Sequence, residues 1–232
     1  MEISRTAAQD IIKGGYVQVA GTTVLKPGVS FPKGTTIAIE GSGRIYVGRG
    51  GDKLEAALHA FDINVYGQVC LDVGASTGGF TDCLLKRGAA KVYAVENGRN
   101  QLASQLIADS RVVSMEETDI RNTTVEWFDE SITLAVVDVS FISLTKVLNP
   151  IMCVVAPKAE IICLIKPQYE VGKGHISKRG IIKDQPTRQR VLDEVCAFAS
   201  SLGLDRKGIL PFPEPPKKNK NQEFLVHFTV SH

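Results

Sequence analysis

The sequence predicts an α/β protein in which helices cover both faces of a mostly parallel sheet. From residue 51 onward, short apolar segments alternate with segments in which apolar residues recur at helical spacing. The apolar segments are continuous runs, as at residues 69–73, and such strands are typical of a parallel sheet buried on both faces. The first 47 residues are instead rich in short elements and turns, so we expect a small α+β unit there.

The large unit is expected to contain seven strands and five helices. The helices are predicted at residues 53–60, 81–87, 101–108, 144–155 and 186–202, where apolar residues recur every three or four positions. The strands are predicted at residues 69–73, 91–95, 112–115, 134–139, 160–166, 208–213 and 224–230. Strands that alternate with helices in this way favour a parallel arrangement.

The small unit is predicted to begin with a helix over residues 4–13, followed by strands at 16–19, 22–25 and 36–40. The helix carries an apolar stripe at helical spacing, made of Ala7, Ala8, Ile11 and Ile12. We therefore expect a small domain at residues 1–43, a linker at 44–52 and a large domain at 53–232.

The net charge of the chain and the length of its apolar runs exclude some classes of protein. The chain has 232 residues, and its 27 Lys and Arg against 25 Asp and Glu give a net charge of only +2. That balance excludes a highly basic tail protein, although a basic face remains open. There is no run of ~18 apolar residues and no apolar signal-peptide core at the N-terminus, so we expect a cytoplasmic protein without a membrane span.

The five cysteines are expected to be reduced core residues. They are odd in number, contain no CxxC pair and lie at Cys70, Cys83, Cys153, Cys163 and Cys196. Metal ligation is the alternative, but no tetrahedral ligand set can be picked out, and we expect no bound metal.

A glycine-rich turn follows the first strand of the large domain. It reads Gly74, Ala75, Ser76, Thr77, Gly78, Gly79 and Phe80. Glycines allow a ligand to approach the backbone closely, and the next helix offers unpaired N–H groups. Glu96 ends the next strand 22 residues after Gly74, where an acidic side chain can bind both hydroxyls of an adenosine ribose.

Two cofactors fit such a turn to different degrees. A dinucleotide site needs G-x-G-x-x-G, whereas this turn reads G-x-S-x-G-G and follows Asp72. A carboxylate there would repel a pyrophosphate but could accept a hydrogen bond from an ammonium group, which favours S-adenosylmethionine over NAD. A tight turn without a ligand is the alternative. Asp119, after the third strand, is either an acceptor for the adenine amino group or a helix N-cap.

Charged residues also stand at the ends of apolar strands, where ligands bind in open α/β sheets. Asp138, Lys166 and Glu223 occupy such positions, and Lys53 lies near the start of a helix. A charge beside a buried strand is costly unless it is paired or solvated, so these four residues are expected to converge. The alternative is a set of separate salt bridges. A ribose 2′-hydroxyl is a poor nucleophile, and a lysine whose pKa is lowered by burial and a second lysine could take its proton.

Four segments resemble a known family: YVGRGGDKL at 46–54, LDVGASTGGFTD at 71–82, VDVSFISL at 137–144 and LIKPQYE at 164–170. They are similar to the TlyA (hemolysin A) family of FtsJ-like 2′-O-methyltransferases, and the resemblance covers nearly the whole chain. It implies a Rossmann-like fold, S-adenosylmethionine as cofactor, and 2′-O-methylation of cytidine in ribosomal RNA. It also implies a catalytic tetrad of Lys53, Asp138, Lys166 and Glu223, with Lys166 as the base and Asp138 also at the cofactor.

The first domain resembles the second half of the ribosomal-protein-S4-type RNA-binding domain over residues 4–21. The helix that precedes this half in the family has no counterpart here, either because the protein starts late or because the sequence is truncated. Three positions depart from the usual pattern: Gly48 stands for Ser, Glu96 for Asp and Asp119 for Asn.

Basic residues near the expected tetrad indicate an RNA surface. The candidates for RNA contact are Arg5, Lys13, Arg49, Lys173, Lys178 and Arg179. The expected partner is ribosomal RNA or a ribosomal subunit, with no membrane partner. Two other functions stay open: a membrane-active hemolysin, as the family name suggests, and a non-catalytic RNA-binding factor of ribosome assembly.

Overall fold

A computed structural model describes residues 8, 9, 12, 17–39, 46–172, 177, 180–182, 184–213 and 221–231. The chain divides into two compact units, Met1–Ile45 and Tyr46–His232. The division falls inside the expected linker at 44–52, but residues 49–52 do not connect the two units. They form the first turn of helix α2 (Arg49–Ala60) in the second unit.

The described part of the first unit is a small antiparallel sheet in the order β2-β1-β3. Its strands are β1 (Val17–Val19), β2 (Thr22–Thr23) and β3 (Ile37–Ile39). Strand β2 ends two residues earlier than expected and β3 begins one residue later, whereas residues 16 and 40, expected at strand ends, lie outside the described residues. Ala20 and Gly21 both have positive φ, as a two-residue hairpin turn requires. Of the helix expected at 4–13, only Ala8, Gln9 and Ile12 are described, and all three are helical.

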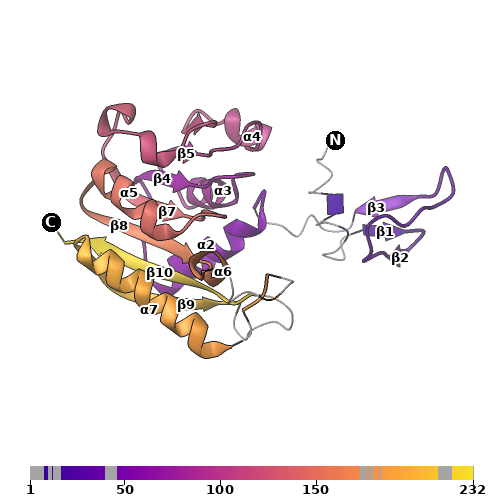
Figure 1. The fold of residues 1–232 in the computed structure, drawn as a ribbon. Helices are drawn as coiled ribbons and strands as arrows, with labels where there is room; N and C mark the ends of the chain where they lie inside the picture. The colour runs from indigo at the N-terminus through magenta and orange to yellow at the C-terminus, as the bar shows by residue number, and fades with distance from the viewer. Residues whose placement is uncertain are drawn as a thin grey trace. The chain divides into compact units, whose positions relative to one another are not determined.

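The second unit contains a seven-stranded sheet in the order β6-β5-β4-β7-β8-β10-β9, as Figure 1 shows. The strands are β4 (Val69–Val73), β5 (Lys91–Val95), β6 (Val112–Met115), β7 (Ile132–Val137), β8 (Val155–Ile165), β9 (Leu204–Phe212) and β10 (Glu223–Val230). Strands β6, β5, β4, β7 and β8 pair in parallel, whereas β10 pairs antiparallel with both β8 and β9. The prediction of a seven-stranded, mostly parallel sheet is therefore confirmed.

Helices cover both faces of this sheet (Figure 1). They are α2, α3 (Gly79–Lys86), α4 (Ser104–Ile107), α5 (Leu148–Val154), α6 (Pro167–Glu170) and α7 (Gln185–Ser201), with short 3-10 helices η1 (Ile120–Asn122), η2 (Val125–Trp127) and η3 (Leu144–Lys146). One hydrophobic core contains residues of α5 and α7, and the other contains residues of α2 and α3. Strand β7 contributes Ala135 to the first core and Val136 to the second, which explains why its sequence is apolar throughout.

Several boundaries differ from the prediction. The helix expected at 101–108 is reduced to α4, and the one expected at 144–155 is split into η3 and α5. The strand expected at 134–139 ends at Val137, so Asp138 lies in the following loop. Four cysteines are buried and unpaired as expected, but Cys153 on α5 is exposed.

The topology identifies one edge of the sheet as the place for a ligand. The chain passes from β4 outward through β5 to β6, and then returns to place β7 on the other side of β4. Ligands bind at such a switch point, beyond the carboxyl ends of the strands. Among the described residues, no helix is long and apolar enough to cross a membrane.

Candidate active site

The loop after β4 is held against two neighbouring strands. The N–H groups of Gly74 and Ala75 donate to the carbonyl of Val95, at 2.9 Å and 3.2 Å. Gly74 has a φ of +85°, and a Cβ atom there would lie 2.8 Å from the carbonyl oxygen of Asp138. A side chain is therefore excluded on two grounds, backbone conformation and space. Gly74 is the point at which the loop after β4 touches the loop after β7.

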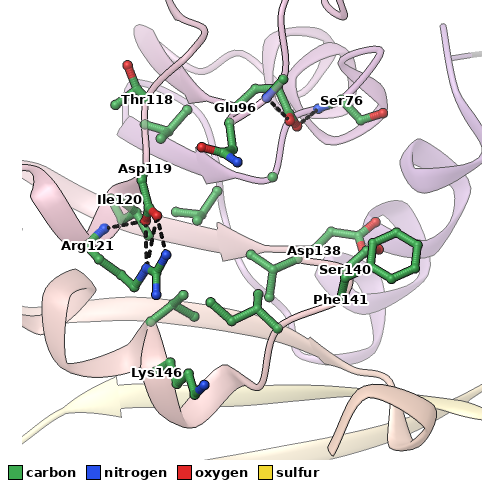
Figure 2. Close-up of a pocket in the computed structure, with 18 residues that line it drawn as sticks. Ser76, Glu96, Thr118, Asp119, Ile120, Arg121, Asp138, Ser140, Phe141 and Lys146 are labelled. Carbon is green, nitrogen blue, oxygen red and sulfur yellow. Dashed lines mark hydrogen bonds and ion pairs between the residues drawn. The ribbon is translucent and has the colours of Figure 1, made fainter.

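Glu96 fixes the tip of the same loop. Its carboxylate accepts hydrogen bonds from the N–H of Ser76 at 2.9 Å and the N–H of Gly98 at 2.7 Å. Figure 2 shows the Glu96 side chain reaching toward Ser76 at the wall of a pocket. Because a carboxylate has about four acceptor positions, two hydrogen bonds leave Glu96 able to accept from a ligand as well.

A cavity of about 730 Å³ lies beyond the carboxyl ends of β4, β5 and β7. That volume lies within the range of about 300–1,000 Å³ that is typical of small-molecule sites. Five residues expected to bind the cofactor line it: Gly74, Ser76, Glu96, Asp119 and Asp138. The cavity wall also includes residues that the sequence did not single out, among them Thr118, Ile120, Arg121, Ser140, Phe141, Ile142 and Lys146.

Asp72 does not line the cavity, contrary to the expectation that it meets a ligand's ammonium group. Side chains alternate along a strand, so Asp72 lies on the same face as Cys70, toward α3. There it is fully buried and accepts a hydrogen bond from Thr81 Oγ1 at 2.6 Å. Burial raises the pKa of Asp72 to about 7, although the hydrogen bond from Thr81 opposes this shift. Asp72 thus attaches the start of α3 to β4.

The rest of the glycine-rich turn shapes the packing between helices. Ala75, Gly78, Gly79 and Phe80 are buried, and Thr77 is exposed, but none of the five lines the cavity. A Cβ atom on Gly79 would lie 3.1 Å from the backbone nitrogen of Gly51. The glycine therefore allows α3 to begin close to the first turn of α2, the helix that carries Lys53.

Asp119 is a helix N-cap, which is one of the two roles that the sequence predicts for it. It is the N-cap of η1, where its side chain accepts from the N–H of Arg121 at 3.0 Å. It also forms an ion pair with the Arg121 guanidinium at 2.5 Å, and this hydrogen bonding lowers the pKa of Asp119. Figure 2 shows both side chains at the cavity wall. The contact with an adenine amino group stays a prediction.

The four charged residues at the strand ends form two ion pairs. Lys53 Nζ lies 2.5 Å from Glu223 Oε2, and Lys166 Nζ lies 2.5 Å from Asp138 Oδ1. The pairs lie side by side, because Phe224 on β10 pairs with Ile165 on β8, which places Glu223 next to Lys166. All four side chains keep only 10–20% of their surface exposed. The structure thus brings together the residues that the sequence places up to 170 positions apart.

Asp138 joins the cavity to the ion pairs. It lines the cavity, and its N–H donates to the carbonyl of Val73 at the end of β4. Burial raises the pKa of Asp138, and the charges of Lys166 and Lys53 oppose that shift. Lys166 also donates to Ser140 Oγ at 2.8 Å. A nucleophile held at Lys166 would therefore be adjacent to a ligand in the cavity.

Other expected and unexpected residues surround this centre. Arg49, the first residue of α2, is exposed, whereas Arg5, Lys13, Lys173, Lys178 and Arg179 lie outside the described residues. Phe141 is 88% exposed, and its ring centroid lies 5.0 Å from that of Tyr169. The sequence signal for this pair was that each aromatic residue comes three positions after a strand-end charge, Phe141 after Asp138 and Tyr169 after Lys166.

Comparison with known proteins agrees with this geometry. The family described as FtsJ-like methyltransferase matches residues 46–230. Hemolysin A of Brachyspira hyodysenteriae is 42% identical over 98% of this chain and 94% of its own length. A protein of Mycobacterium tuberculosis named 16S/23S rRNA (cytidine-2′-O)-methyltransferase TlyA is 41% identical over 96% of this chain and 83% of its own length.

Solved structures support the same assignment. A candidate hemolysin from Streptococcus thermophilus superposes with a TM-score of 0.82 at 38% identity, covering 98% of this chain and 83% of that one. The fold alone is shared with more distant proteins described as S-adenosylmethionine-dependent methyltransferases, at TM-scores of 0.52–0.58 and 12–14% identity. The chain therefore belongs to the FtsJ-like methyltransferases and, within them, to the family of the hemolysin A and TlyA proteins.

Proposed function

We propose that this protein transfers a methyl group from S-adenosylmethionine to the ribose 2′-hydroxyl of a cytidine in ribosomal RNA. The observation that supports this proposal most strongly is that two ion pairs, Lys53–Glu223 and Lys166–Asp138, lie side by side. Asp138 also lines the cavity, so the ion pairs lie at its edge. The name of the relative in Mycobacterium tuberculosis supports the choice of cytidine in ribosomal RNA.

The residues of the cavity suit this cofactor. Three carboxylates, those of Glu96, Asp119 and Asp138, line the wall together with two cations, Arg121 and Lys146. Because Arg121 is paired with Asp119, the wall supports this cofactor through its hydrogen-bond acceptors and not through a net charge. Glu96 would hold the ribose hydroxyls, Asp119 the adenine amino group, and Gly74 would allow the ligand to approach the backbone. When bound, S-adenosylmethionine supplies a methyl group on a positively charged sulfur.

The tetrad would bind the ribose and handle its proton. Lys166 accepts the proton of the 2′-hydroxyl as the new bond from oxygen to carbon forms and the bond from carbon to sulfur breaks. Asp138 holds the Lys166 side chain at the cavity, and Glu223 holds Lys53 beside it. Most of the rate acceleration would come from this positioning, because the methyl donor is already activated.

RNA would bind through basic residues of both units. Arg49 is exposed on the first turn of α2, four residues before Lys53. Arg5, Lys13, Lys173, Lys178 and Arg179 are the other candidates, and the S4-type unit at the N-terminus would add affinity. An enzyme with this substrate would act in the cytoplasm, where ribosomes are found.

The test is methyl transfer from radiolabelled S-adenosylmethionine to purified ribosomal subunits and to free ribosomal RNA. We expect incorporation that maps to ribose 2′-oxygens of cytidine and that is lost in Lys166→Ala. The proposal fails if the purified protein shows no incorporation on any of these substrates and no cofactor binding by calorimetry. Dose-dependent release of dye from liposomes would instead support a membrane-active hemolysin.

A further inference from the structure

The loop between β7 and η3 is attached to α6 by a carboxylate that the proposed mechanism does not use. Glu170, the last residue of α6, accepts a hydrogen bond from Ser143 Oγ at 2.5 Å and another from the N–H of Leu144 at 2.9 Å. Helix α6 begins directly after Lys166. Glu170 therefore connects the segment that carries Lys166 to the far end of the loop that begins with Asp138.

The same loop is attached a second time, at Lys166 itself. Ser140 Oγ accepts a hydrogen bond from Lys166 Nζ at 2.8 Å. Between the two attachments, Phe141 has a φ of +65°, a left-handed conformation that strains the backbone of a non-glycine residue. Such strain persists only where the surroundings enforce it, and the hydrogen bonds of Ser140 and Glu170 are the contacts on either side.

These contacts determine which way the side-chain nitrogen of Lys166 points. Asp138 Oδ1 lies 2.5 Å from Lys166 Nζ, and Ser140 Oγ accepts a hydrogen bond from it at 2.8 Å. The carbonyl oxygen of Asp138 is 3.5 Å away, where a hydrogen bond is weak. As the proposed proton acceptor, Lys166 is a neutral amine with two N–H groups and one lone pair. With the N–H groups directed at Asp138 and Ser140, the lone pair is left for a hydroxyl group at the cavity.

From this geometry, and resting on the proposed function, we infer that Ser140 and Glu170 are positioning residues for Lys166. Ser140 sets the rotation of the Lys166 amino group directly. Glu170 acts one step further away, because it holds the strained loop at the place where Ser140 can reach Lys166. Neither residue belongs to the tetrad. Ser140 also lines the cavity, but its hydroxyl is bonded to Lys166, so we assign it to the orientation of the proton acceptor and not to cofactor binding.

The experiment compares Ser140→Ala, Ser140→Thr, Glu170→Gln and the double variant Ser140→Ala/Glu170→Gln in the methyl-transfer assay. We expect Ser140→Ala and Glu170→Gln to lower kcat by about 10- to 100-fold, as misplacement of a catalytic group does. The Kd for S-adenosylmethionine and the KM for RNA should stay within about threefold of wild type. Ser140→Thr keeps the hydroxyl on an exposed side chain and should restore most of kcat.

The double variant separates positioning from general stability. If both residues act through Lys166, the double variant should lose little more than the worse single variant, since interacting residues are not additive. Glu194→Gln and Ser201→Ala on α7 are the matched controls, and both should have wild-type kcat. Glu194 pairs only with the exposed Arg190 among the contacts of the described chain, and Ser201 donates to Phe198.

Three results would overturn the inference: wild-type kcat in Ser140→Ala, an additive double variant, or a loss of cofactor affinity that equals the loss of kcat. Should Glu170→Gln fail to fold in thermal melts, the Ser140→Ala and Ser140→Thr pair decides alone. Failure of the proposed function looks different, because wild type itself would then transfer no methyl group to ribosomal RNA, and the inference would fall with it.

Discussion

The part of the site proposed to hold the cofactor (the cofactor half) and the part proposed to carry out the transfer (the transfer half) are held together by different kinds of contact. In the cofactor half, at the ends of β4, β5 and β6, carboxylates bind backbone N–H groups of nearby loops. Glu96 accepts from Ser76 and Gly98, and Glu116 accepts from three consecutive N–H groups at residues 100–102. The transfer half consists of Lys53, Asp138, Lys166 and Glu223, whose side chains pair with one another.

This difference predicts different sensitivities to substitution. Backbone N–H groups are present whatever the side chain, so the loops of the cofactor half tolerate many substitutions as long as the carboxylates remain. Each member of the transfer half, by contrast, leaves a largely buried opposite charge without its partner when it is removed, which is strongly unfavourable. The predictions below test this contrast, starting from the largest expected effect.

Removal of Lys166 should have the largest effect and should be confined to the transfer half. We expect Lys166→Ala to lower kcat by about 10²- to 10⁴-fold, the range for loss of a general base. The Kd for S-adenosylmethionine should change by less than about threefold, because Lys166 does not line the cavity. Single-turnover kinetics and calorimetry measure the two quantities.

Lys207→Ala on β9 is the control, because it removes an exposed lysine and should match wild type. A normal kcat in Lys166→Ala would exclude Lys166 as the base.

Gly74 is the place where the two halves touch, so Gly74→Ala should damage both. A left-handed φ costs an alanine about 1–2 kcal/mol, and the new Cβ would also press on the carbonyl of Asp138. We expect cofactor affinity and kcat each to fall by about tenfold or more.

Gly67→Ala is the matched control for Gly74→Ala. Gly67 has a φ of +74° but nothing within 4 Å of its Cβ position, so this variant shares the backbone strain without the contact. It should lose stability in thermal melts and keep both cofactor affinity and kcat. Equal behaviour of the two variants in the assay would show that contact with Asp138 does not matter.

The two halves also differ in how far the sequence predicts them. The strands at 69–73 and 91–95 agree with the prediction at both ends, because buried parallel strands are short apolar runs with clear limits. The edge strand at 112–115 also agrees at both ends. Strand β9 begins four residues earlier than expected, at Leu204 rather than 208. It lies at the edge of the sheet, and the exposed residues Asp205, Arg206 and Lys207 interrupt its apolar pattern.

For the site, the sequence predicts which residues gather but not how they pair. The strand-end rule and the family resemblance both indicate Lys53, Asp138, Lys166 and Glu223. The role of Asp72 could not be predicted in the same way, since it depends on which face of β4 the side chain occupies and on the position of Thr81. The contacts of Ser140 and Glu170 could not be predicted from the sequence either, because they depend on the path of the loop after β7.

The pH dependence of stability tests whether Asp72, which attaches α3 to β4, is buried as the structure shows. The pKa of Asp72 is raised to about 7 by burial, whereas an unfolded aspartate has a pKa of about 3.9. Between these values the folded protein holds a proton that the unfolded chain has released, so the free energy of unfolding should fall as pH rises from about 4 to about 7. Asp72→Asn cannot titrate and should lack this contribution.

Urea denaturation at several pH values measures that effect. The stability of Asp72→Asn relative to wild type should increase with pH across this window, while other titrating groups cancel in the difference. Asp129→Asn removes an exposed carboxyl and should run parallel to wild type. A constant difference between Asp72→Asn and wild type at all pH values would show that Asp72 is ionised in the folded protein.

Glu116 should give the smallest effect, and one confined to the cofactor half. The Glu116 carboxylate accepts three backbone hydrogen bonds, and these lower its pKa. The hydrogen bond from the N–H of Leu102 makes the largest contribution to this shift. They hold the loop that follows Gly98, a residue of the cavity wall. Glu116→Gln keeps some acceptor capacity, so we expect a Kd for S-adenosylmethionine only about three- to tenfold weaker, with kcat unchanged at saturating cofactor. Glu117→Gln, at the neighbouring exposed position, should bind the cofactor as wild type does.

The lowered pKa keeps Glu116 ionised over the usual pH range. The affinity of wild type for the cofactor should therefore not change through this group between pH 8 and pH 5, and it should weaken only as pH falls through the lowered pKa. A loss of kcat in Glu116→Gln at saturating cofactor would mean that the two halves are coupled, and that the contrast drawn between them does not hold.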